Sequence, residues 1–530
     1  MNVDALIIGA GHNGLTAACY LARAGLSVRV LEARHVVGGA AVTEEFHPGY
    51  RNSVASYTVS LLHPKVIADL RLAEHGLRVV FRPMSNFLPL PDGDALGVGP
   101  ELADTVAEVR RFSAADAQRL PDYYAMLERL ADALRALVLV TPPDPNAGIG
   151  GLLDTLKTAR RLHGLPVAAQ RDLVELFGRS AGEILDDWFE SAPIKAALGF
   201  DSIVGAYASP YAPGSGYVQL HHCFGEVNGR KGAWGHAIGG MGAITQAMRA
   251  EAVRLGVQIS VDAAVARVKV RAGRAGGVVL ASGDEIDARL VVAGVGPKLL
   301  YNRLIAPEHL DGEVRQRIER FKTGSGVLRM NVALSELPDF CGRGSVPQAH
   351  HGAGIIVAPS LDYMERAHVE ARAHGMSRSP VVEVLIPSTL DDSLAPPGAH
   401  VASLFCQYFA PQLPDGRSWD DARDAAADLA IDAVTRVAPN FRRSIVARQV
   451  LTPLDLERTF GLSDGDIFHG RLSLEQLFSS RPMLGYADYR TPIRGLYLCG
   501  SGAHPGGGVT GVPGHNAARE ILRDLRRRRV

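Results

Sequence analysis

The sequence predicts an α/β fold in which a doubly wound parallel sheet is interrupted by a long α+β insertion. Three observations support this class. The first thirty or so residues alternate strand, glycine-rich turn, helix and strand. Two further apolar strands that end in glycine, at residues 290–294 and 495–500, lie far down the chain. The residues between these segments carry helices and strands of a different pattern, so we expect a second lobe inserted into the first.

The N-terminal segment has the order of elements that a nucleotide-binding unit requires. Residues 3–8 are predicted as a buried strand, residues 15–24 as a helix and residues 27–31 as a second strand. The turn after the first strand reads GAGHNG, which matches G-x-G-x-x-G. A helix that begins at such a turn offers free N–H groups and partial positive charge to phosphates.

Each glycine of the turn has a physical role. Gly9 permits the tight turn, Gly11 lets the backbone approach a pyrophosphate, and Gly14 lets the helix pack close to the strand. Glu32, at the end of the second strand, can accept hydrogen bonds from ribose hydroxyls. Together these features predict a Rossmann-like domain that binds a dinucleotide.

A glycine pair follows shortly after the ribose acid. Gly38 and Gly39, which precede Ala40, allow close backbone approach a second time. A pair at this place is characteristic of flavin oxidases and desaturases, so FAD is the expected cofactor. Arg34 is placed to reach the adenosine or phosphate end, with a solvated arginine as the alternative. Small polar residues around Ser56 fit a segment that lines the flavin.

Length and composition exclude several classes of protein. A chain of 530 residues is too long for one ordinary domain, so two domains or a two-lobed enzyme are expected. Its 56 basic and 56 acidic side chains cancel, which argues against nucleic acid as a main partner. The five cysteines are scattered without a C-x-x-C pair. We therefore expect no disulfide framework, no cysteine-ligated zinc and no redox-active cysteine pair.

The ends of the chain bear on its location. The first strand begins at Val3, so we expect no signal or transit peptide. No apolar run reaches the length of a membrane span, and a cytoplasmic protein is expected. The arginine run at residues 526–529 could make a peripheral contact with anionic lipid, and a solvated tail is the alternative. The sequence carries no signal for an oligomeric state.

The insertion begins with helices and continues with strands. A helix is predicted at residues 104–111, and Ser113 is expected to cap a second one that runs to about residue 140. Shorter helices follow to about residue 204. The later elements are strands at residues 257–260, 265–270, 277–280, 327–334, 381–386 and 401–408 and helices at residues 244–255 and 420–437. The last three strands are compatible with an antiparallel sheet in a substrate domain.

Outside the glycine turn, the stretch with the most side chains that could take part in catalysis is at residues 217–236. His221, His222 and Glu226 are candidates for substrate polarisation or proton transfer. A metal site is not expected, because zinc requires a third and fourth protein ligand and none is indicated nearby. Structural histidines that bond within the fold are the other interpretation.

The C-terminal segment is expected to return to the cofactor. Gly294 ends a buried parallel strand on the side that faces the ligand in doubly wound sheets. Gly500 ends a similar strand and is followed by Ser501 and His504. A helix at residues 515–526 then follows, and its N-terminus could stabilise negative charge on a reduced flavin. His504 is the first candidate for a residue close to the flavin ring.

These patterns divide the chain into five parts. The expected parts are a first part of the FAD-binding domain at 1–90, a helical substrate or cap region at 91–233, a second FAD-binding part at 234–300, a substrate domain at 301–480 and a third FAD-binding part at 481–530.

With both ends in view, the chain resembles the phytoene desaturase–carotenoid isomerase branch of the FAD-dependent amine-oxidase-like proteins. The motifs that carry the resemblance are GAGHNGL…LEARHVVGGAA near the N-terminus and GLYLCGSGAHPGGGVTGVPGHNA near the C-terminus. The resemblance spans nearly the whole chain. It implies a non-covalently bound FAD and a two-lobed fold.

The resemblance also implies roles for single residues. Val265 would hold the adenine by its backbone, and the C-terminal segment would close over the pyrophosphate and ring with Gly500, Ser501, Val509 and Gly511. Many flavoproteins have an acid where this chain has Ser501. Only one complete dinucleotide fingerprint is present, so oxygen or a quinone is expected as electron acceptor rather than bound NAD(P).

The predicted function is an FAD-dependent oxidoreductase that dehydrogenates a small organic substrate by hydride transfer to flavin, in the manner of a phytoene dehydrogenase. Three alternatives stay open. They are a flavin amine oxidase that acts on a small or methylated amine, an isomerase that uses reduced flavin without net oxidation, and a flavin-binding interaction protein without catalysis. A purely apolar pocket would favour a polyene, and an aromatic or carboxylate-lined pocket an amine.

Overall fold

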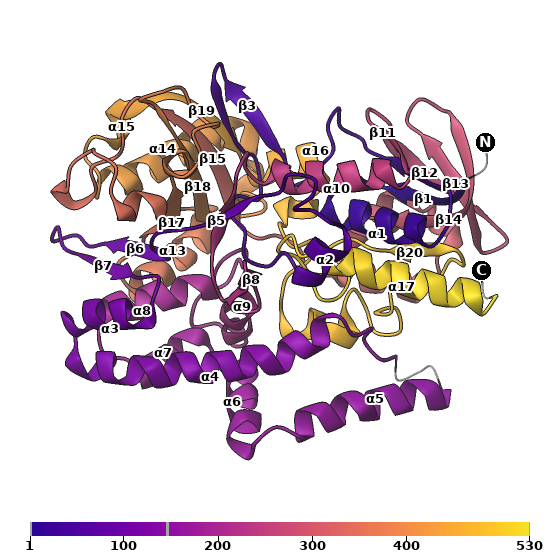
Figure 1. Ribbon diagram of the computed structural model, residues 1–530, viewed down its shortest axis with the longest axis horizontal. Coiled ribbons are helices and arrows are strands. Elements are labelled where there is room, and N and C mark those ends of the chain that lie inside the picture. Colours follow the sequence, from indigo (N-terminus) through magenta and orange to yellow (C-terminus); the bar gives the residue numbers. More distant parts are fainter. Residues whose placement is uncertain (1–2, 145–147, 529) are drawn as a thin grey trace.

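Two seven-stranded sheets organise the chain into two lobes (Figure 1). The computed structural model describes residues 3–144, 148–528 and 530. The first sheet has the order β11-β2-β1-β14-β13-β12, with β20 beside β14. Its strands are β1 (Val3–Ile8), β2 (Val28–Leu31), β11 (Gln258–Ser260), β12 (Val265–Arg271), β13 (Arg274–Leu280), β14 (Glu285–Ala293) and β20 (Leu496–Leu498).

The middle of the first sheet is parallel. β1 pairs in parallel with β2 and β14, and β14 pairs in parallel with β20. The central strands form apolar runs because helices and loops cover both faces of a parallel sheet. The strands predicted near the N-terminus, near residue 290 and near residue 495 therefore lie side by side, as the α/β prediction requires.

Three helices pack side by side on this sheet (Figure 1): α1 (His12–Arg23), α10 (Gly242–Arg254) and α17 (Val512–Arg526). The first and last begin earlier than the sequence predicts. Gly14 and Gly514 lie in their first turns, and the low helix propensity of glycine hides those turns from a sequence pattern.

The second sheet is the antiparallel sheet predicted for the substrate lobe. Its order is β19-β15-β18-β17-β16-β6-β7, and only the β16–β6 pair is parallel. Helices α13 and α14 pack on β17. The elements are β6 (Asn86–Pro89), β7 (Ala95–Val98), β15 (Val327–Leu334), β16 (Gly354–Val357), β17 (Met376–Leu385), β18 (His400–Phe409), β19 (Ile445–Leu451), α13 (Leu361–His374) and α14 (Trp419–Thr435).

The N-terminal part of the chain contributes to both sheets. β6 and β7 form a hairpin at the edge of the second sheet, and the domain limit expected at residue 90 falls in the turn between them. The chain therefore crosses between the lobes several times. The five domain limits stay predictions.

A layer of helices closes one side of the second lobe, and α5 lies apart from this layer at the lower edge of the molecule (Figure 1). The expected cap at Ser113 is present, since its Oγ accepts a hydrogen bond from the Asp116 N–H at 3.1 Å. The helices are α3 (Leu102–Arg110), α4 (Ala114–Val138), α5 (Gly148–His163), α6 (Val167–Gly178), α7 (Ala181–Trp188), α8 (Ala192–Gly199), the 3₁₀ turn η1 (Phe200–Ser202) and α9 (Ser215–His222).

Across the described residues no helix is both long and apolar enough to cross a membrane. Arg529, in the expected basic run, lies outside the described residues.

Shorter elements complete the fold. They are α2 (Pro64–Asp69), α11 (Pro297–Leu299), α12 (Gly312–Arg320), α15 (Phe441–Ser444), α16 (Pro453–Phe460), β3 (Thr43–His47), β4 (Tyr50–Ser53), β5 (Val79–Phe81), β8 (Glu226–Val227), β9 (Arg230–Lys231) and β10 (Gly235–Ala237).

Candidate cofactor and substrate site

The glycine turn joins β1 to α1 with almost no space to spare. Gly9 has φ +94°, a conformation that L side chains rarely adopt. A Cβ added to Gly14 would lie 2.1 Å from the carbonyl oxygen of Gly9. Gly11 forms a β-bridge with Gly38 of the glycine pair. The two glycine-rich segments therefore approach each other through bare backbone.

Glu32 is held in place beside this turn. Its Oε2 accepts a hydrogen bond from the Ala10 N–H at 2.8 Å, and its Oε1 accepts one from the Arg34 N–H at 3.0 Å. The guanidinium of Arg34 pairs with Glu44 at 2.8 Å and lies 5.0 Å from the centre of the Phe460 ring. Glu32 thus presents its carboxylate from a fixed position at the end of β2.

A cavity of about 530 Å³ opens over the turn, and we call it the cofactor cavity. It extends from the turn to α16 and to the loop that follows β20. The predicted cofactor residues that line it are Gly9, Gly11, Glu32, Arg34, Gly39, Ala40, Val265, Gly294 and Ser501. Gly14 and Gly38 are not among its lining residues: Gly14 packs on Gly9, and Gly38 forms the bridge to Gly11.

The C-terminal segment meets the N-terminal one at this cavity. The side-chain amide of Asn13 donates to Ser501 Oγ at 3.1 Å. A Cβ added to Gly500 would lie 2.8 Å from the carbonyl oxygen of Gly294, so glycine is required where β20 passes β14. Gly511 has φ +72° and precedes α17 as its N-cap. Both ends of the chain therefore build one site.

Two histidines mark the inner end of the cofactor cavity. His12 and His469 line both this cavity and a second one, which we call the inner cavity. Burial lowers the pKa of His12 to about 3 and that of His469 to about 4, so both rings are neutral near pH 7. His12 Nε2 and His469 Nδ1 find no hydrogen-bond partner among the described residues.

The inner cavity, of about 130 Å³, combines aromatic and charged side chains. The Tyr57 hydroxyl donates to Glu383 Oε2 at 2.5 Å, and the Tyr57 ring stacks on Phe405 at 5.4 Å. Burial raises the pKa of Tyr57 and of Glu383, while the charge of Arg82 opposes the rise at Glu383. The guanidinium of Arg329 lies 4.3 Å from the centre of the Tyr57 ring.

Arg82 links this cavity to the next. Its guanidinium donates to Thr58 Oγ1 and lies 5.6 Å from the centre of the Trp234 ring. Arg82 and Trp234 also line a third cavity of about 440 Å³, the outer cavity. Residues that line both the inner and the outer cavity are Arg82, Asn86, Asp201, His222 and Trp234.

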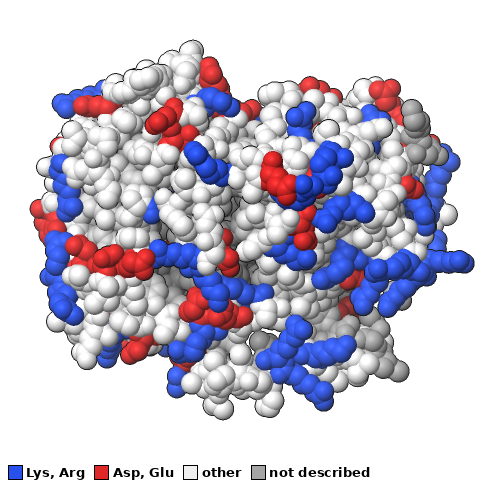
Figure 2. Space-filling view, viewed as in Figure 1, with Lys and Arg blue, Asp and Glu red and all other residues white. Residues whose placement is uncertain are grey.

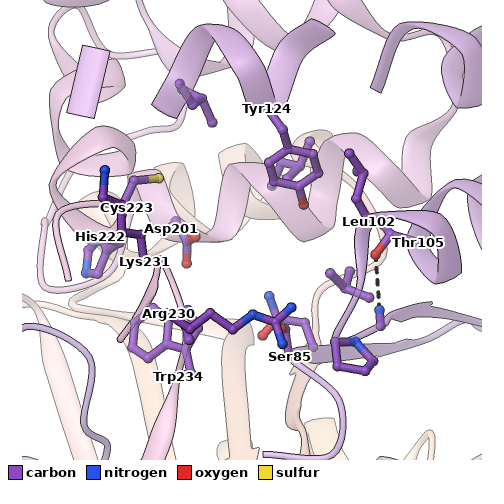
Figure 3. Close-up of a pocket in the computed structure, with 18 of the residues that line it drawn as sticks. Ser85, Leu102, Thr105, Tyr124, Asp201, His222, Cys223, Arg230, Lys231 and Trp234 are labelled. Atoms are coloured by element: carbon purple, nitrogen blue, oxygen red, sulfur yellow. Dashed lines mark hydrogen bonds between the residues drawn. The ribbon is translucent and has the colours of Figure 1, made fainter. Parts of the chain in front are cut away.

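Asp201 projects its carboxyl group into the outer cavity (Figure 3). It comes from η1, and Arg82 and Glu383 are the charged groups that act on it most. The pKa of Asp201 is raised to about 7, mainly by burial, with a further contribution from the charge of Glu383 and an opposing one from Arg82. This carboxyl group therefore changes charge near neutral pH.

The predicted catalytic residues His221 and His222 line different cavities. His222 lines the inner and outer cavities, where its Nδ1 donates to the Val218 carbonyl oxygen at 2.8 Å and burial lowers its pKa to about 4. His221 and Glu226 line a separate cavity of about 150 Å³. Within the described chain, no group of three or more His, Cys, Asp or Glu residues could hold a metal ion.

His504 is buried in the C-terminal loop. Its Nε2 lies 3.0 Å from the carbonyl oxygen of Leu137, and its ring packs edge-on against Phe478 at 5.1 Å. It is not among the lining residues of the cofactor, inner or outer cavity. Ser56 and Val509, two predicted cofactor residues, do line the inner cavity. A direct role for His504 stays a prediction.

Several lining residues were not singled out from the sequence. Glu383 gave a usable signal, because it is a lone acid inside the apolar strand β17. His12 gave another, as an aromatic side chain within the glycine turn. Tyr57, Arg82 and Asp201 gave none, because only the tertiary fold brings them together.

The cofactor cavity fits FAD. Glycines leave the space that a pyrophosphate requires, and α1 begins at Gly11 without a side-chain cap, so its N-terminal N–H groups are available to phosphate. Glu32 stands at the ribose position of the fingerprint. Unpartnered buried atoms among the described lining residues His12, Asn13 and Arg34 are further groups that a polar ligand could satisfy.

Comparisons with known proteins agree with this fit. The flavin containing amine oxidoreductase family matches residues 14–328. The chain is 42% identical over 544 residues to pyridine nucleotide-disulfide oxidoreductase domain-containing protein 2 of Rattus norvegicus, which covers 99% of this chain and 94% of that protein. It is 24% identical over 531 residues to the lycopene-forming phytoene desaturase of a Paracoccus species, and the alignment covers 98% of this chain and 97% of that protein.

Solved structures share the fold. Putrescine oxidase bound to putrescine superposes with a TM-score of 0.60 at 17% identity, and 99% of each chain is covered. The expected resemblance, the α/β two-lobed fold and FAD as cofactor are confirmed. The chain belongs to the flavin containing amine oxidoreductase family and is an FAD-dependent oxidoreductase.

Proposed function

We propose that the protein dehydrogenates an organic substrate that carries a basic nitrogen, at a carbon next to that nitrogen, forming C=N. The observation that supports this proposal is the charged and aromatic lining of the inner cavity. Asp201 and Glu383 can accept hydrogen bonds from a cationic nitrogen, and Tyr57, Trp234 and Phe405 line the same cavity with aromatic rings.

The chain's own residues would bind the substrate and exclude water. FAD, when bound, supplies the hydride acceptor. Asp201 stands at the junction of the outer and inner cavities, where its carboxylate can hold a cationic nitrogen. The Tyr57–Glu383 bond fixes the carboxylate of Glu383, and the neutral His222 ring can hydrogen-bond without adding charge. Oxygen or a quinone is the acceptor that we propose for the electrons.

A long polyene is a weaker match to this cavity. A polyene is a hydrocarbon and offers no hydrogen-bonding group to the charged side chains that line this cavity. Arg82, Asp201 and Glu383 all line a cavity of about 130 Å³. Dehydrogenation to C=C, which the predicted phytoene-dehydrogenase-like reaction entails, is therefore the second candidate, supported by the similarity to the Paracoccus desaturase.

Anaerobic mixing of the FAD-loaded protein with a panel of amines and lipophilic alkenes tests the proposal. Bleaching of the flavin by an amine, with a product that has lost two hydrogens, is the expected result. Bleaching by alkenes alone would favour the desaturase. A product of unchanged mass would favour an isomerase, and the absence of bleaching by any compound would favour a flavin-binding interaction protein.

A further inference from the structure

Helix α5 turns three of its leucines toward solvent. It lies at the edge of the molecule, away from both sheets (Figure 1). Leu152, Leu153 and Leu156 are 56%, 52% and 49% exposed. These positions follow the helical spacing that normally faces a protein core. Here they form an outward stripe, which we call the leucine stripe.

The opposite face of α5 is the one that meets the protein. Gly151 is buried, and Thr155 and Thr158 are half-buried. Thr155 Oγ1 donates to the Gly151 carbonyl oxygen at 2.8 Å, so its hydroxyl is satisfied within the helix. A surface helix of a globular protein places its apolar stripe inward and its polar face outward. Among the α5 side chains that the structure describes, this arrangement is reversed.

The segments at both ends of α5 are attached to the rest of the molecule. Before the helix, the Arg519 guanidinium of α17 donates to the Leu139 carbonyl oxygen at 2.6 Å. After it, the Gln170 side chain of α6 donates to the carbonyl oxygens of His163 and Leu165 at 3.0 and 2.8 Å. The chain is therefore held at the end of α4 and directly after α5, so the leucine stripe belongs to an internal segment and not to a free tail.

Basic side chains lie on the same helix as the stripe. Arg160 and Arg161 are exposed on the same helix and form no ion pair with any other residue that the structure describes. Figure 2 shows a group of basic side chains at the lower edge of the molecule, where Figure 1 places α5. Arg523 and Arg526 lie in the last turn of α17, where Arg523 pairs with Glu520 at 3.5 Å. The exposed leucines beside Arg160 and Arg161 match an interface between apolar chains and anionic head groups.

We propose that α5 docks the protein on an anionic lipid surface, with the leucine stripe in the acyl boundary and Arg160 and Arg161 against lipid phosphates. A second copy of this chain fits the helix less well. A stable homodimer buries about 800 Å² on each partner, which a stripe of three leucines does not supply. A two-fold contact would also bring the arginines of both copies together, and like charges repel.

Vesicle co-sedimentation of the FAD-loaded protein tests the proposal. The probes are vesicles of phosphatidylcholine alone and of phosphatidylcholine with phosphatidylglycerol. The wild type should sediment with the anionic vesicles, less with the neutral ones, and less again at high salt. The variant Leu152→Asp/Leu156→Asp should bind anionic vesicles at least about tenfold more weakly. The variant Arg160→Glu/Arg161→Glu should lose its preference for anionic lipid.

A matched control separates docking from a general effect of surface charge. Val369 on α13 is 55% exposed, and Val369→Asp should bind vesicles like the wild type. Retained flavin absorbance and an unchanged Tm show that each variant is folded. Equal binding of wild type and the leucine variant would overturn the proposal. So would a wild-type dimer that becomes monomeric in the leucine variant without any change in vesicle binding.

Discussion

Tyr57 and Glu383 meet inside the inner cavity, where the phenol hydroxyl donates to the carboxylate at 2.5 Å. Tyr57 follows β4, whereas Glu383 lies within β17 of the second sheet. Burial raises the pKa of both groups, and the nearby charge of Arg82 opposes the rise at Glu383. The bond therefore ties two distant segments of the chain together at the place where we expect the substrate to bind.

Replacing Tyr57 by phenylalanine leaves a buried acceptor without its donor. We expect Tyr57→Phe to lower the free energy of unfolding by about 1–3 kcal/mol in urea at pH 7. Tyr301→Phe is the matched control, because the buried Tyr301 hydroxyl has no partner among the described residues. An equal loss in both variants would show that the Tyr57–Glu383 bond contributes nothing specific.

Asp201 makes stability depend on pH in a defined direction. Its pKa is raised from 3.8 to about 7, mainly by burial, so the folded state holds this proton more tightly than the unfolded state does. The associated stability is complete below about pH 4 and is lost as the pH rises through 7. Relative to Asp201→Asn, the wild type should lose on the order of 4 kcal/mol across that window.

Cation binding should strengthen as the pH rises, whereas the stability that Asp201 contributes is lost. The carboxylate form of Asp201 attracts a positive nitrogen, so a permanent cation such as benzyltrimethylammonium should bind more tightly above pH 7 than below it. Difference spectra of the bound flavin report this binding. In Asp201→Asn the pH dependence should disappear. A dependence that persists in the variant would assign it to another group.

The glycine turn gives a prediction about the cofactor. A methyl group at position 14 would collide with the Gly9 carbonyl oxygen, since the Cβ would lie 2.1 Å from it. We expect Gly14→Ala to weaken FAD binding by at least about tenfold, because the turn must open and the helix must move off the strand. Gly312→Ala is the control, since a Cβ at Gly312 meets nothing within 4 Å. Fluorescence titration of the apoproteins with FAD measures both.

The part of the fold built from local rules could be predicted from the sequence. The first strand, the glycine turn and Glu32 follow from requirements that act within some thirty residues. The strand at residues 327–334 was predicted with the limits that β15 has. The early start of α1 was missed, because glycines near its N-terminus disguise a helical turn that the phosphate site requires.

The substrate side of the site could not be predicted in the same way. Tyr57, Arg82, Asp201 and Glu383 come from four separate segments, and only tertiary packing brings them to one cavity. Side-chain direction in an irregular loop is equally hidden from the sequence. His504 follows Ser501 closely, yet its ring turns to Leu137 and away from the cofactor cavity.

Replacing His222 should affect flavin reduction, whereas replacing His504 should affect mainly the Tm. His222 lines the inner cavity, so His222→Gln should slow flavin reduction by an active substrate about tenfold or more. His504→Gln should act mainly on Tm, because its ring is bonded to the backbone outside the lining of the three cavities. Single-turnover flavin reduction and thermal unfolding of both variants measure these effects. A large loss of reduction rate in His504→Gln with an unchanged Tm would restore His504 as a residue beside the ring.

The central claim is that the inner cavity selects a nitrogen-bearing substrate for dehydrogenation, and anaerobic reduction of the bound flavin tests it most directly. Each amine should be paired with a hydrocarbon of the same carbon skeleton that lacks the nitrogen. We predict that at least one amine bleaches the flavin and that its hydrocarbon partner does not. Bleaching by lipophilic alkenes while every amine is inert would contradict the account.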